Sequence, residues 1–351
     1  MNLKNLSVKI KIPKIFRDTL KNKKISTIYN RFEKTLNIDE KFAVAVSGGP
    51  DSLALCFLIS YYKSIENKKI QTYFFIVDHG LRKGSAEEAL YVKKQLKTKK
   101  INLKILKWRG KKPNSNLQSL AREKRYNLLF NECDKLNIKN ILTAHNEDDV
   151  YETFFSRLLR GSGLEGLSSF VKVEKKFIFK GNTISVIRPL LDCTKESLTY
   201  ITKKVFNSYI NDPSNYMEKF QRVRLRNIIT NLKNQGLNFD KLKLTINNLA
   251  SANTTINEMV INNISSNVNY IKKRYLIAPA FFSYPDEIVF RSFSILIKKI
   301  SKKDYPPRGR KIISLIKELN SKDKIKATLG GTIIEKIHNS VVVYEEKTKK
   351  G

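Results

Sequence analysis

The sequence is poor in cysteine and acidic residues, and it lacks a long apolar run. Its three cysteines, Cys56, Cys133 and Cys193, are far apart and no C-x-x-C pair occurs. This spacing argues against a disulfide scaffold, a zinc knuckle and a cysteine-ligated iron–sulfur cluster, and it fits a reducing compartment. No run approaches the roughly 18 apolar residues that cross a bilayer, and lysines interrupt residues 1–14, where a secretory signal needs an apolar segment. We expect a soluble, cytoplasmic protein with no membrane association.

Basic residues outnumber acidic ones two to one. The chain has 67 Lys and Arg against 32 Asp and Glu, a net charge of +35. Such an excess repels itself unless a polyanion offsets it, which favours a nucleic acid partner. The alternative is a compositional bias in which lysines simply solvate the surface. An acidic membrane surface fits less well, because no segment pairs a basic face with a clean apolar face.

The first 40 residues hold a basic arm and a predicted helix. Residues 1–24 contain eight Lys or Arg against one Asp. A transit peptide is the alternative for this arm, although its low Ser and Arg content argues against one. The apolar spacing in residues 25–36 predicts a helix ahead of the first strand.

From Lys41 onward, short β-branched or aromatic runs alternate with helical patterns. The predicted strands are residues 42–46, 70–77, 101–108 and 140–145, and the predicted helices are residues 52–62, 85–100 and 116–136. Alternating strands and helices are typical of a parallel sheet with helices on both faces. The fold class is therefore predicted as α/β with a doubly wound parallel sheet.

The chain changes character after Phe170. The predicted elements are a hairpin over residues 175–191, a helix over 194–210, a mostly helical stretch over 220–320 and a small closing hairpin over 327–346. The expected domains are the basic arm at 1–24, an α/β domain at 25–218 and a mainly helical domain with a C-terminal hairpin at 219–351.

A glycine-rich segment follows the first predicted strand. It consists of Ser47, Gly48, Gly49, Pro50, Asp51 and Ser52. Glycines between a strand end and a helix N-terminus let backbone N–H groups approach phosphate oxygens, and the helix dipole adds positive potential. The two serine hydroxyls are further donors, and Asp51 is a candidate Mg²⁺ ligand. No G-x-x-x-x-G-K-[ST] pattern occurs, so this is not a Walker A loop; an ordinary turn is the alternative.

A second glycine-rich segment, Gly161–Gly166, matches G-x-G-x-x-G literally. The dinucleotide-binding fingerprint must follow a strand, whereas this segment follows residues 151–160, whose spacing is helical. We therefore interpret the segment as a helix end followed by a loop and reject dinucleotide binding.

Three acidic residues, Glu147, Asp148 and Asp149, come shortly after His145 and the fourth predicted strand. They lie at the carboxyl edge of the sheet, where open α/β sheets bind ligands. Adjacent carboxylates are costly unless they are solvated, metal-bound or opposed by cations, so we expect at least one to meet Mg²⁺ or an amine. A capping cluster on the next helix is the alternative.

The second predicted strand ends at the same edge with Asp78 and His79. A lone histidine is more often structural than functional. Its position beside a carboxylate at a strand terminus favours a functional role here.

These residues together resemble the tRNA(Ile)-lysidine synthetase family of the N-type ATP-pyrophosphatase (PP-loop) superfamily. The shared motifs are SGGPDS at 47–52, DHGL at 78–81, Ala121-Arg122-x-x-Arg125-Tyr126, His145-x-x-Asp148-Asp149-x-x-Glu152-Thr153, LLRGSGLEGL at 158–167, Arg188-Pro189-Leu190-Leu191 and DPSN at 212–215. Thiouridylases, GMP synthetase and NAD synthetase share the first motif, whereas the later set is far more specific. The resemblance is strong over about residues 25–230 and weaker beyond.

The resemblance implies a reaction and its substrates. Free L-lysine is attached to C2 of the wobble cytidine in an isoleucine tRNA with a CAU anticodon, through an adenylated cytidine. ATP and Mg²⁺ are required, and the helical domain binds tRNA. Many family members have Gln where this chain has Val150. We expect the extra C-terminal domain of longer members to be missing, so that its tRNA contacts are either absent or supplied elsewhere, for example by the basic arm. The sequence leaves the oligomeric state open.

The resemblance also implies residue roles. The segment from Ser47 to Ser52, with Asp78 and His79, is expected to bind ATP, and Asp51 is expected to hold Mg²⁺. We expect Asp149 to act on the lysine amine, as its base or as the group that orients it. Asp148 is the second candidate for this role. The remaining candidates are Arg122 as a catalytic residue, with Arg125, His145, Glu152, Arg160 and Arg188 as tRNA or substrate contacts. For Arg122 and Arg125, at (i, i+3) on one helical face, the alternative is ordinary surface arginine.

Two other functions remain possible on sequence grounds. A PP-loop tRNA sulfur-transferase needs a catalytic cysteine pair or cluster ligands, and Cys56 and Cys133 lie within apolar helical patterns. The other is a non-catalytic RNA-binding protein with a degenerate ATP loop.

Overall fold

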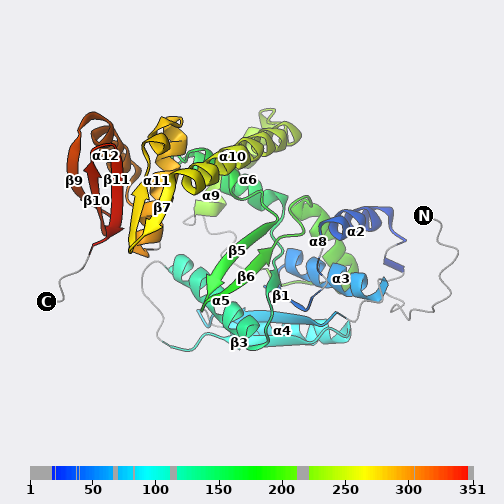
Figure 1. Cartoon of the computed structure of the whole chain (residues 1–351). Coiled ribbons are helices and arrows are strands. Elements are labelled where there is room, and N and C mark those ends of the chain that lie inside the picture. Colours follow the sequence, from blue (N-terminus) through cyan, green and yellow to red (C-terminus); the bar gives the residue numbers. More distant parts are fainter. Residues whose placement is uncertain are drawn as a thin grey trace, which may run out of the picture. The chain divides into compact units, whose positions relative to one another are not determined.

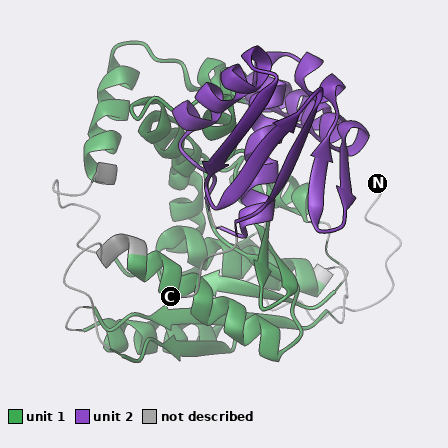
Figure 2. Cartoon of the chain, turned by 60° about the vertical axis from the view of Figure 1, so that its left-hand side comes forward, with its two compact units in different colours: residues 1–246 green, residues 247–351 purple. Residues whose placement is uncertain are grey.

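A computed structural model describes residues 18–19, 21–36, 38, 40–65, 70–81, 84–110, 117–211, 221–303 and 305–346. The chain divides into two compact units, residues 1–246 and 247–351 (Figure 2). This division falls inside one long helix, whereas the boundary expected at 218/219 lies among residues that the structure does not describe.

Unit 1 contains a six-stranded sheet in the order β3-β2-β1-β4-β6-β5 (Figure 1). The strands are β1 (Phe42–Val46), β2 (Thr72–Asp78), β3 (Leu103–Lys107), β4 (Asn140–Leu142), β5 (Glu174–Phe179) and β6 (Asn182–Ile187). All neighbours pair in parallel except β5 and β6, which form an antiparallel hairpin. The predicted parallel α/β sheet and the predicted hairpin are confirmed.

Helices cover both faces of this sheet. The helices of this unit are α2 (Lys23–Thr35), α3 (Pro50–Ile65), α4 (Ser85–Thr98), α5 (Leu117–Lys135), α6 (Glu147–Leu158), α7 (Leu164–Ser168), α8 (Lys195–Phe206) and α9 (Gln221–Asn234), followed by α10 (Phe239–Asn267), which crosses into unit 2. Alternate residues of β1 face opposite cores: Val44 packs with α2, α3, α4 and α8, and Ala43 packs with α5. Burial on both faces explains why the parallel strands are continuous apolar runs.

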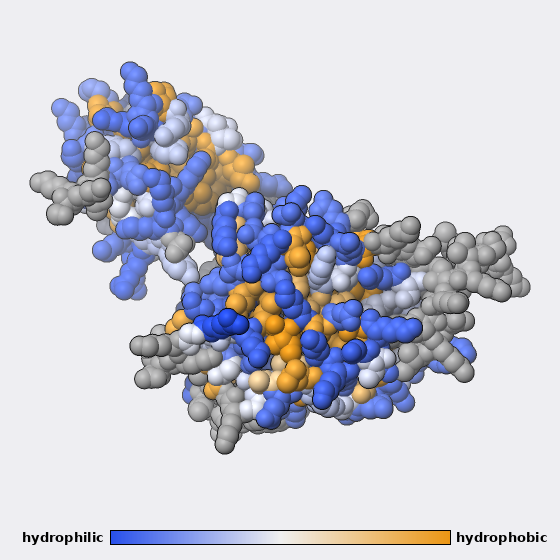
Figure 3. Space-filling view, turned by 90° about the horizontal axis from the view of Figure 1, so that it is seen from below, coloured by the Kyte–Doolittle hydropathy of each residue, from blue (hydrophilic) through white to orange (hydrophobic). Residues whose placement is uncertain are grey.

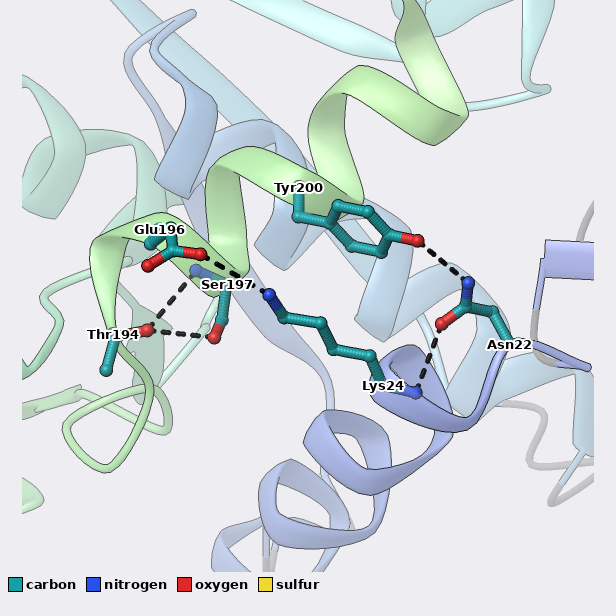
Figure 4. Close-up of polar contacts among 6 residues, drawn as sticks. All are labelled: Asn22, Lys24, Thr194, Glu196, Ser197 and Tyr200. Atoms are coloured by element: carbon teal, nitrogen blue, oxygen red, sulfur yellow. Dashed lines mark hydrogen bonds and ion pairs between the residues drawn. The ribbon is translucent and has the colours of Figure 1, made fainter.

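The first described helix is attached to α8 (Figure 4). Asn22 caps α2, its Oδ1 accepting from the backbone N–H of Lys24 at 3.1 Å, while its Nδ2 donates to the Tyr200 hydroxyl at 2.8 Å. The Lys24 ammonium lies 3.5 Å from Glu196. The residues just before 25 therefore belong to the folded unit, while 1–17 lie outside the described residues.

The strand order reverses between β1 and β4. In open α/β sheets the loops that leave the two strands at such a point diverge, and ligands bind between them. The loop after β1 begins at Ser47, and the loop after β4 carries His145. The topology thus brings the SGGPDS loop and the acidic segment after β4 together, although they lie far apart in the sequence.

Unit 2 combines helices with a five-stranded sheet in the order β7-β8-β11-β10-β9. Its elements are β7 (Val268–Ile271), β8 (Arg274–Ile277), a 3-10 helix η2 (Pro279–Ser283), α11 (Asp286–Ser301), α12 (Gly309–Ser321), β9 (Lys324–Leu329), β10 (Thr332–Ile337) and β11 (Ser340–Glu345). All its strand pairs are antiparallel. The predicted, mainly helical pattern is confirmed. The predicted closing hairpin has three strands, β9 to β11, and β7 and β8 interrupt the stretch that was predicted as helical.

The surface agrees with the composition. Hydrophilic residues dominate the face in Figure 3, and apolar residues come to the surface in groups between them. No helix among the described residues is long and apolar enough to cross a membrane.

Candidate active site

The loop after β1 is held in shape by its own hydroxyls. The Ser52 hydroxyl donates to the carbonyl of Gly49 at 2.9 Å and accepts from the backbone N–H of Ser47 at 3.1 Å. Gly48 has a φ of +83°, and a Cβ there would meet Val92 at 2.8 Å, so both conformation and space require glycine. Pro50 begins α3, where its missing N–H costs nothing. The loop therefore presents a helix N-terminus to the sheet edge, as predicted.

Asp51 is the partly buried carboxylate of this loop. Burial is the largest cause that raises its pKa, to about 7, with Asp149 and Asp148 raising it further and Lys195 opposing them. Its Oδ1 is buried and accepts no hydrogen bond from the described part of the chain. A buried carboxylate oxygen without a donor is costly unless a ligand or cation satisfies it. The donor set therefore suits a hard cation such as Mg²⁺.

The acidic segment begins α6 with a capping box. The side chain of Asn146 accepts from the backbone N–H of Asp149 at 3.2 Å, and Asp149 Oδ2 accepts from the backbone N–H of Asn146 at 3.0 Å. The Asn146 side chain is also near enough to Asp51 to lower the pKa of that carboxyl, against the larger effect of burial. Asp149 is therefore part of a helix cap, which was the alternative interpretation of the acidic segment. The cap also holds its carboxylate near enough to Asp51 to raise the pKa of that residue.

Asp148 and Glu147 have different surroundings. Glu147 pairs with Lys243 of α10 at 2.9 Å. Asp148 has a raised pKa because of burial, an effect that the Lys195 ammonium opposes, and it accepts from the backbone of Lys195. Asp148 is thus the carboxylate of this segment whose proton affinity the fold increases.

Asp78 and His79 end β2 at the same edge. Asp78 Oδ1 accepts from the backbone N–H of Gly80 at 2.9 Å and from the Ser85 hydroxyl at 2.8 Å, so it shapes the turn into α4. His79 Nε2 accepts from Arg125 Nε at 3.3 Å. These contacts explain the local structure, and the expected ATP contact of Asp78 and His79 stays a prediction.

His145 and Arg188 both contact the ring of Phe170. The His145 ring lies edge-on to Phe170 at 5.6 Å, and the Arg188 guanidinium lies over the same ring at 4.4 Å. Asp149 is near enough to raise the pKa of Arg188, although burial has the larger, opposite effect. Both residues therefore belong to the edge that carries Asp149.

Three further candidate residues lie on α6, just after α6 and on α5: Glu152, Arg160 and Arg122. Glu152 is buried and pairs with Arg226 of α9, a contact that ties α6 to α9. Arg160 is exposed just beyond α6. Arg122 is exposed on α5 and lies over the ring of Tyr126 at 5.2 Å. The expected substrate contacts of these three stay predictions, and the DPSN segment lies outside the described residues.

Two site residues were missed by sequence reasoning. Asn146 links Asp51 to the capping box, and the N-x-x-D spacing before an apolar helix was the available signal. Lys195 acts on both Asp51 and Asp148. No local pattern marks it, because only the fold brings the start of α8 to this edge.

The three thiols are buried. Burial raises the pKa of Cys133 to about 12 and that of Cys193 to about 11, and it raises the pKa of Cys56 as well. A thiol in this state is a poor nucleophile and a poor metal ligand.

Comparisons with known proteins agree with this geometry. A profile of the PP-loop domain matches residues 18–233. The tRNA(Ile)-lysidine synthase of Orientia tsutsugamushi (strain Boryong) is 32% identical over 325 residues, covering 87% of this chain and 70% of that protein. The protein of the same name from Rickettsia typhi is 31% identical over 336 residues, covering 92% and 75%.

A solved structure extends the comparison of folds. The U34-tRNA thiolase NcsA from Methanococcus maripaludis, with its 4Fe–4S cluster, has a TM-score of 0.52 and 19% identity over 67% of this chain and 79% of that chain. At this identity the likeness shows the fold alone.

Proposed function

This chain belongs to the tRNA(Ile)-lysidine synthase family, and we propose from this membership that it joins free L-lysine to C2 of the wobble cytidine of a CAU-anticodon tRNA(Ile). The chain is an enzyme that uses ATP, as its PP-loop domain implies. The observation that carries the proposal is the meeting of the SGGPDS loop with Asp148 and Asp149 at one sheet edge. A nucleotide loop beside carboxylates suits a ligase that activates one substrate and adds an amine to it.

The chemistry divides into two displacements. The C2 carbonyl oxygen of cytidine attacks the α-phosphorus of ATP, forming an O–P bond and releasing pyrophosphate. The ε-amine of lysine then attacks C2, a C–N bond forms, and the C–O bond breaks to release AMP. Adenylation is needed because the carbonyl oxygen is otherwise a poor leaving group.

The loop after β1 supplies the first step with donors. Its backbone N–H groups and the α3 N-terminus face the departing pyrophosphate. Asp51 would hold Mg²⁺, which offsets charge on the phosphates, and one carboxylate plus substrate oxygens is the usual donor set of this ion. Lys195 would add a cation near the same oxygens.

The acidic segment serves the second step. An ammonium group must lose a proton before it attacks, so a carboxylate must lie beside it. Asp149, fixed by the capping box, orients the amine, and Asp148, with its raised pKa, accepts the proton. The ordinary carboxylate pKa is far below 7, so the increase brings Asp148 closer to the working pH.

The partner and compartment follow from charge and chemistry. A net charge of +35 complements a polyphosphate chain. A cytoplasmic location fits the ATP, lysine and tRNA that the reaction consumes. The sulfur-transferase alternative is disfavoured because the three cysteines are buried with raised pKa values.

The experiment that tests the proposal measures pyrophosphate release from ATP and formation of AMP. Stoichiometric AMP that appears only when tRNA(Ile) and lysine are both present supports it. Turnover with tRNA and a sulfur donor, in the absence of lysine, would overturn it in favour of sulfur transfer.

A further inference from the structure

Arg188 is a buried arginine that lacks a carboxylate partner. It is 4% exposed, its Nη1 donates to the Phe170 carbonyl at 3.4 Å, and its Nε is buried without a hydrogen-bond acceptor. Among the described residues it forms no ion pair. A buried guanidinium is costly without an anion, so an arginine in this state indicates a missing ligand.

Other cations surround it. Burial lowers the pKa of Lys175, and Arg188, Arg157 and Arg122 lower it further. Arg122 and Arg157 also lower the pKa of Arg188, after its burial. These like charges repel one another, so a bound anion would stabilise their charged forms.

Aromatic rings fix the positions of these cations. The Lys175 ammonium lies 5.1 Å from the centre of the Phe177 ring, which stacks on Tyr126 at 5.9 Å. Arg122 lies over the other partner of that stack, Tyr126, at 5.2 Å. Lys175 is therefore on the face of β5 that packs against α5, the side of the sheet that carries Arg122.

Among the acids of the candidate active site, Asp149 is close enough for its charge to raise the pKa of Arg188, although burial has the larger, opposite effect. A cation and an anion side by side suit a zwitterion, whose carboxylate meets the first while its amine meets the second. An RNA phosphodiester would satisfy Arg188 as well, but it would bring no amine to Asp148 and Asp149.

We propose that Arg188, together with Lys175 and Arg122, binds the α-carboxylate of the amino acid substrate, while Asp148 and Asp149 receive its side-chain amine. This inference rests on the proposed function. It makes the arginine cluster a determinant of amino acid selection: diamines that lack a carboxylate bind weakly, although they carry the same nucleophile.

The test first measures adduct formation by the wild-type protein with ATP, tRNA(Ile) and either L-lysine or 1,5-diaminopentane. It then compares KM values of Lys175→Met, in which the charge is lost at an exposed position, with those of Lys176→Met. Lys176 is the matched control, because it lies next along β5 on the opposite face, beside Glu174. Arg188→Met and Arg188→Lys form a second pair, in which the lysine variant restores part of the charge.

We expect Lys175→Met to raise the KM for L-lysine about 10-fold, equivalent to about 1.4 kcal/mol. Its KM for 1,5-diaminopentane and for tRNA should stay the same, and Lys176→Met should match the wild type. A higher KM for tRNA with an unchanged KM for lysine would overturn the proposal and assign the cluster to an RNA phosphodiester. Unchanged KM values in both Lys175→Met and Arg188→Met would overturn the anion site altogether.

A wild-type protein that forms no adduct with lysine would instead defeat the proposed function, and this inference with it. A wild-type protein that forms the adduct, with the same KM for lysine and for 1,5-diaminopentane, would defeat only the inference.

Discussion

Each unit buries an arginine, and their surroundings differ. Arg291 in unit 2 is 6% exposed and donates to Glu287 at 2.7 Å and to Asn253 at 2.6 Å. Arg188 in unit 1 is 4% exposed and has a buried Nε without an acceptor. A satisfied buried charge is part of the structure, whereas an unsatisfied one is held for a ligand.

The same contrast applies to the acids. Glu287 is half of an (i, i+4) ion pair on α11. Asp51 has an orphaned oxygen and a pKa raised to about 7 by burial and by neighbouring carboxylates. The fold tolerates this unsatisfied carboxylate at the β1–β4 edge. If a bound ligand or cation normally satisfies it, replacing Asp51 should affect activity far more than folding.

The largest effect is expected for Asp51→Ala. Turnover with Mg²⁺ should fall by a factor of about 10³, since a lost transition-state charge partner costs kcat more than binding. Circular dichroism should remain that of the wild type. Near-normal pyrophosphate release by the folded variant would remove Asp51 from the chemistry.

The two arginines should respond in opposite ways to replacement by methionine. Arg291→Met should lower the free energy of unfolding by about 2 kcal/mol, because it leaves the buried side-chain oxygen of Asn253 without its donor. Arg188→Met should be as stable as the wild type or more stable, because it removes an uncompensated charge. Chemical denaturation measures both, with Arg310→Met at an exposed position of α12 as the control. Equal losses in the two variants would contradict the distinction.

A smaller effect concerns pH. The pKa of Asp51 is about 7 in the folded protein against 3.8 for the free side chain, so the folded state holds the proton more tightly. Ionisation therefore costs stability progressively between about pH 4 and 7, and the whole cost is present above pH 7. Without Mg²⁺, Asp51→Asn should exceed the wild type in stability at pH 8, by up to a few kcal/mol, and match it near pH 4. A stability difference between the two proteins that does not change with pH would argue against the raised pKa.

The smallest effect concerns the basic arm. Residues 1–17 contain five Lys or Arg and no acid. If they contact phosphates, their deletion should reduce the slope of log affinity for tRNA against log salt by up to about 4, at about 0.7–0.9 per phosphate. The deletion stops before Asn22, because Asn22 caps α2 and contacts α8. An unchanged slope would leave the rest of the basic surface as the tRNA contact.

Periodicity predicted most of unit 1, because its strands β1, β2 and β4 are short, mostly buried apolar runs that alternate with longer helical patterns. It missed β7 and β8 for a local reason. Their turn is formed by Lys272 and Lys273, both with positive φ, where the usual signal is Asn-Gly. The strands also follow α10 directly, without a glycine or proline to mark the change.

The site was partly predictable. The SGGPDS loop and the acids after β4 are local patterns whose shared edge follows from the alternation of strands and helices. The missing counter-charge of Arg188 and the effect of Lys195 on Asp51 are properties of tertiary packing. No sequence pattern reports that a buried charge lacks a partner.

The most direct test of the central claim is mass analysis of nucleosides from isoleucine tRNA incubated with this protein, ATP, Mg²⁺ and L-lysine. We predict that the wobble cytidine is replaced by a nucleoside heavier by one lysine less one water, and that this product is absent without ATP. An unmodified cytidine, or one in which sulfur replaces the C2 oxygen when a sulfur donor is present, would contradict the account.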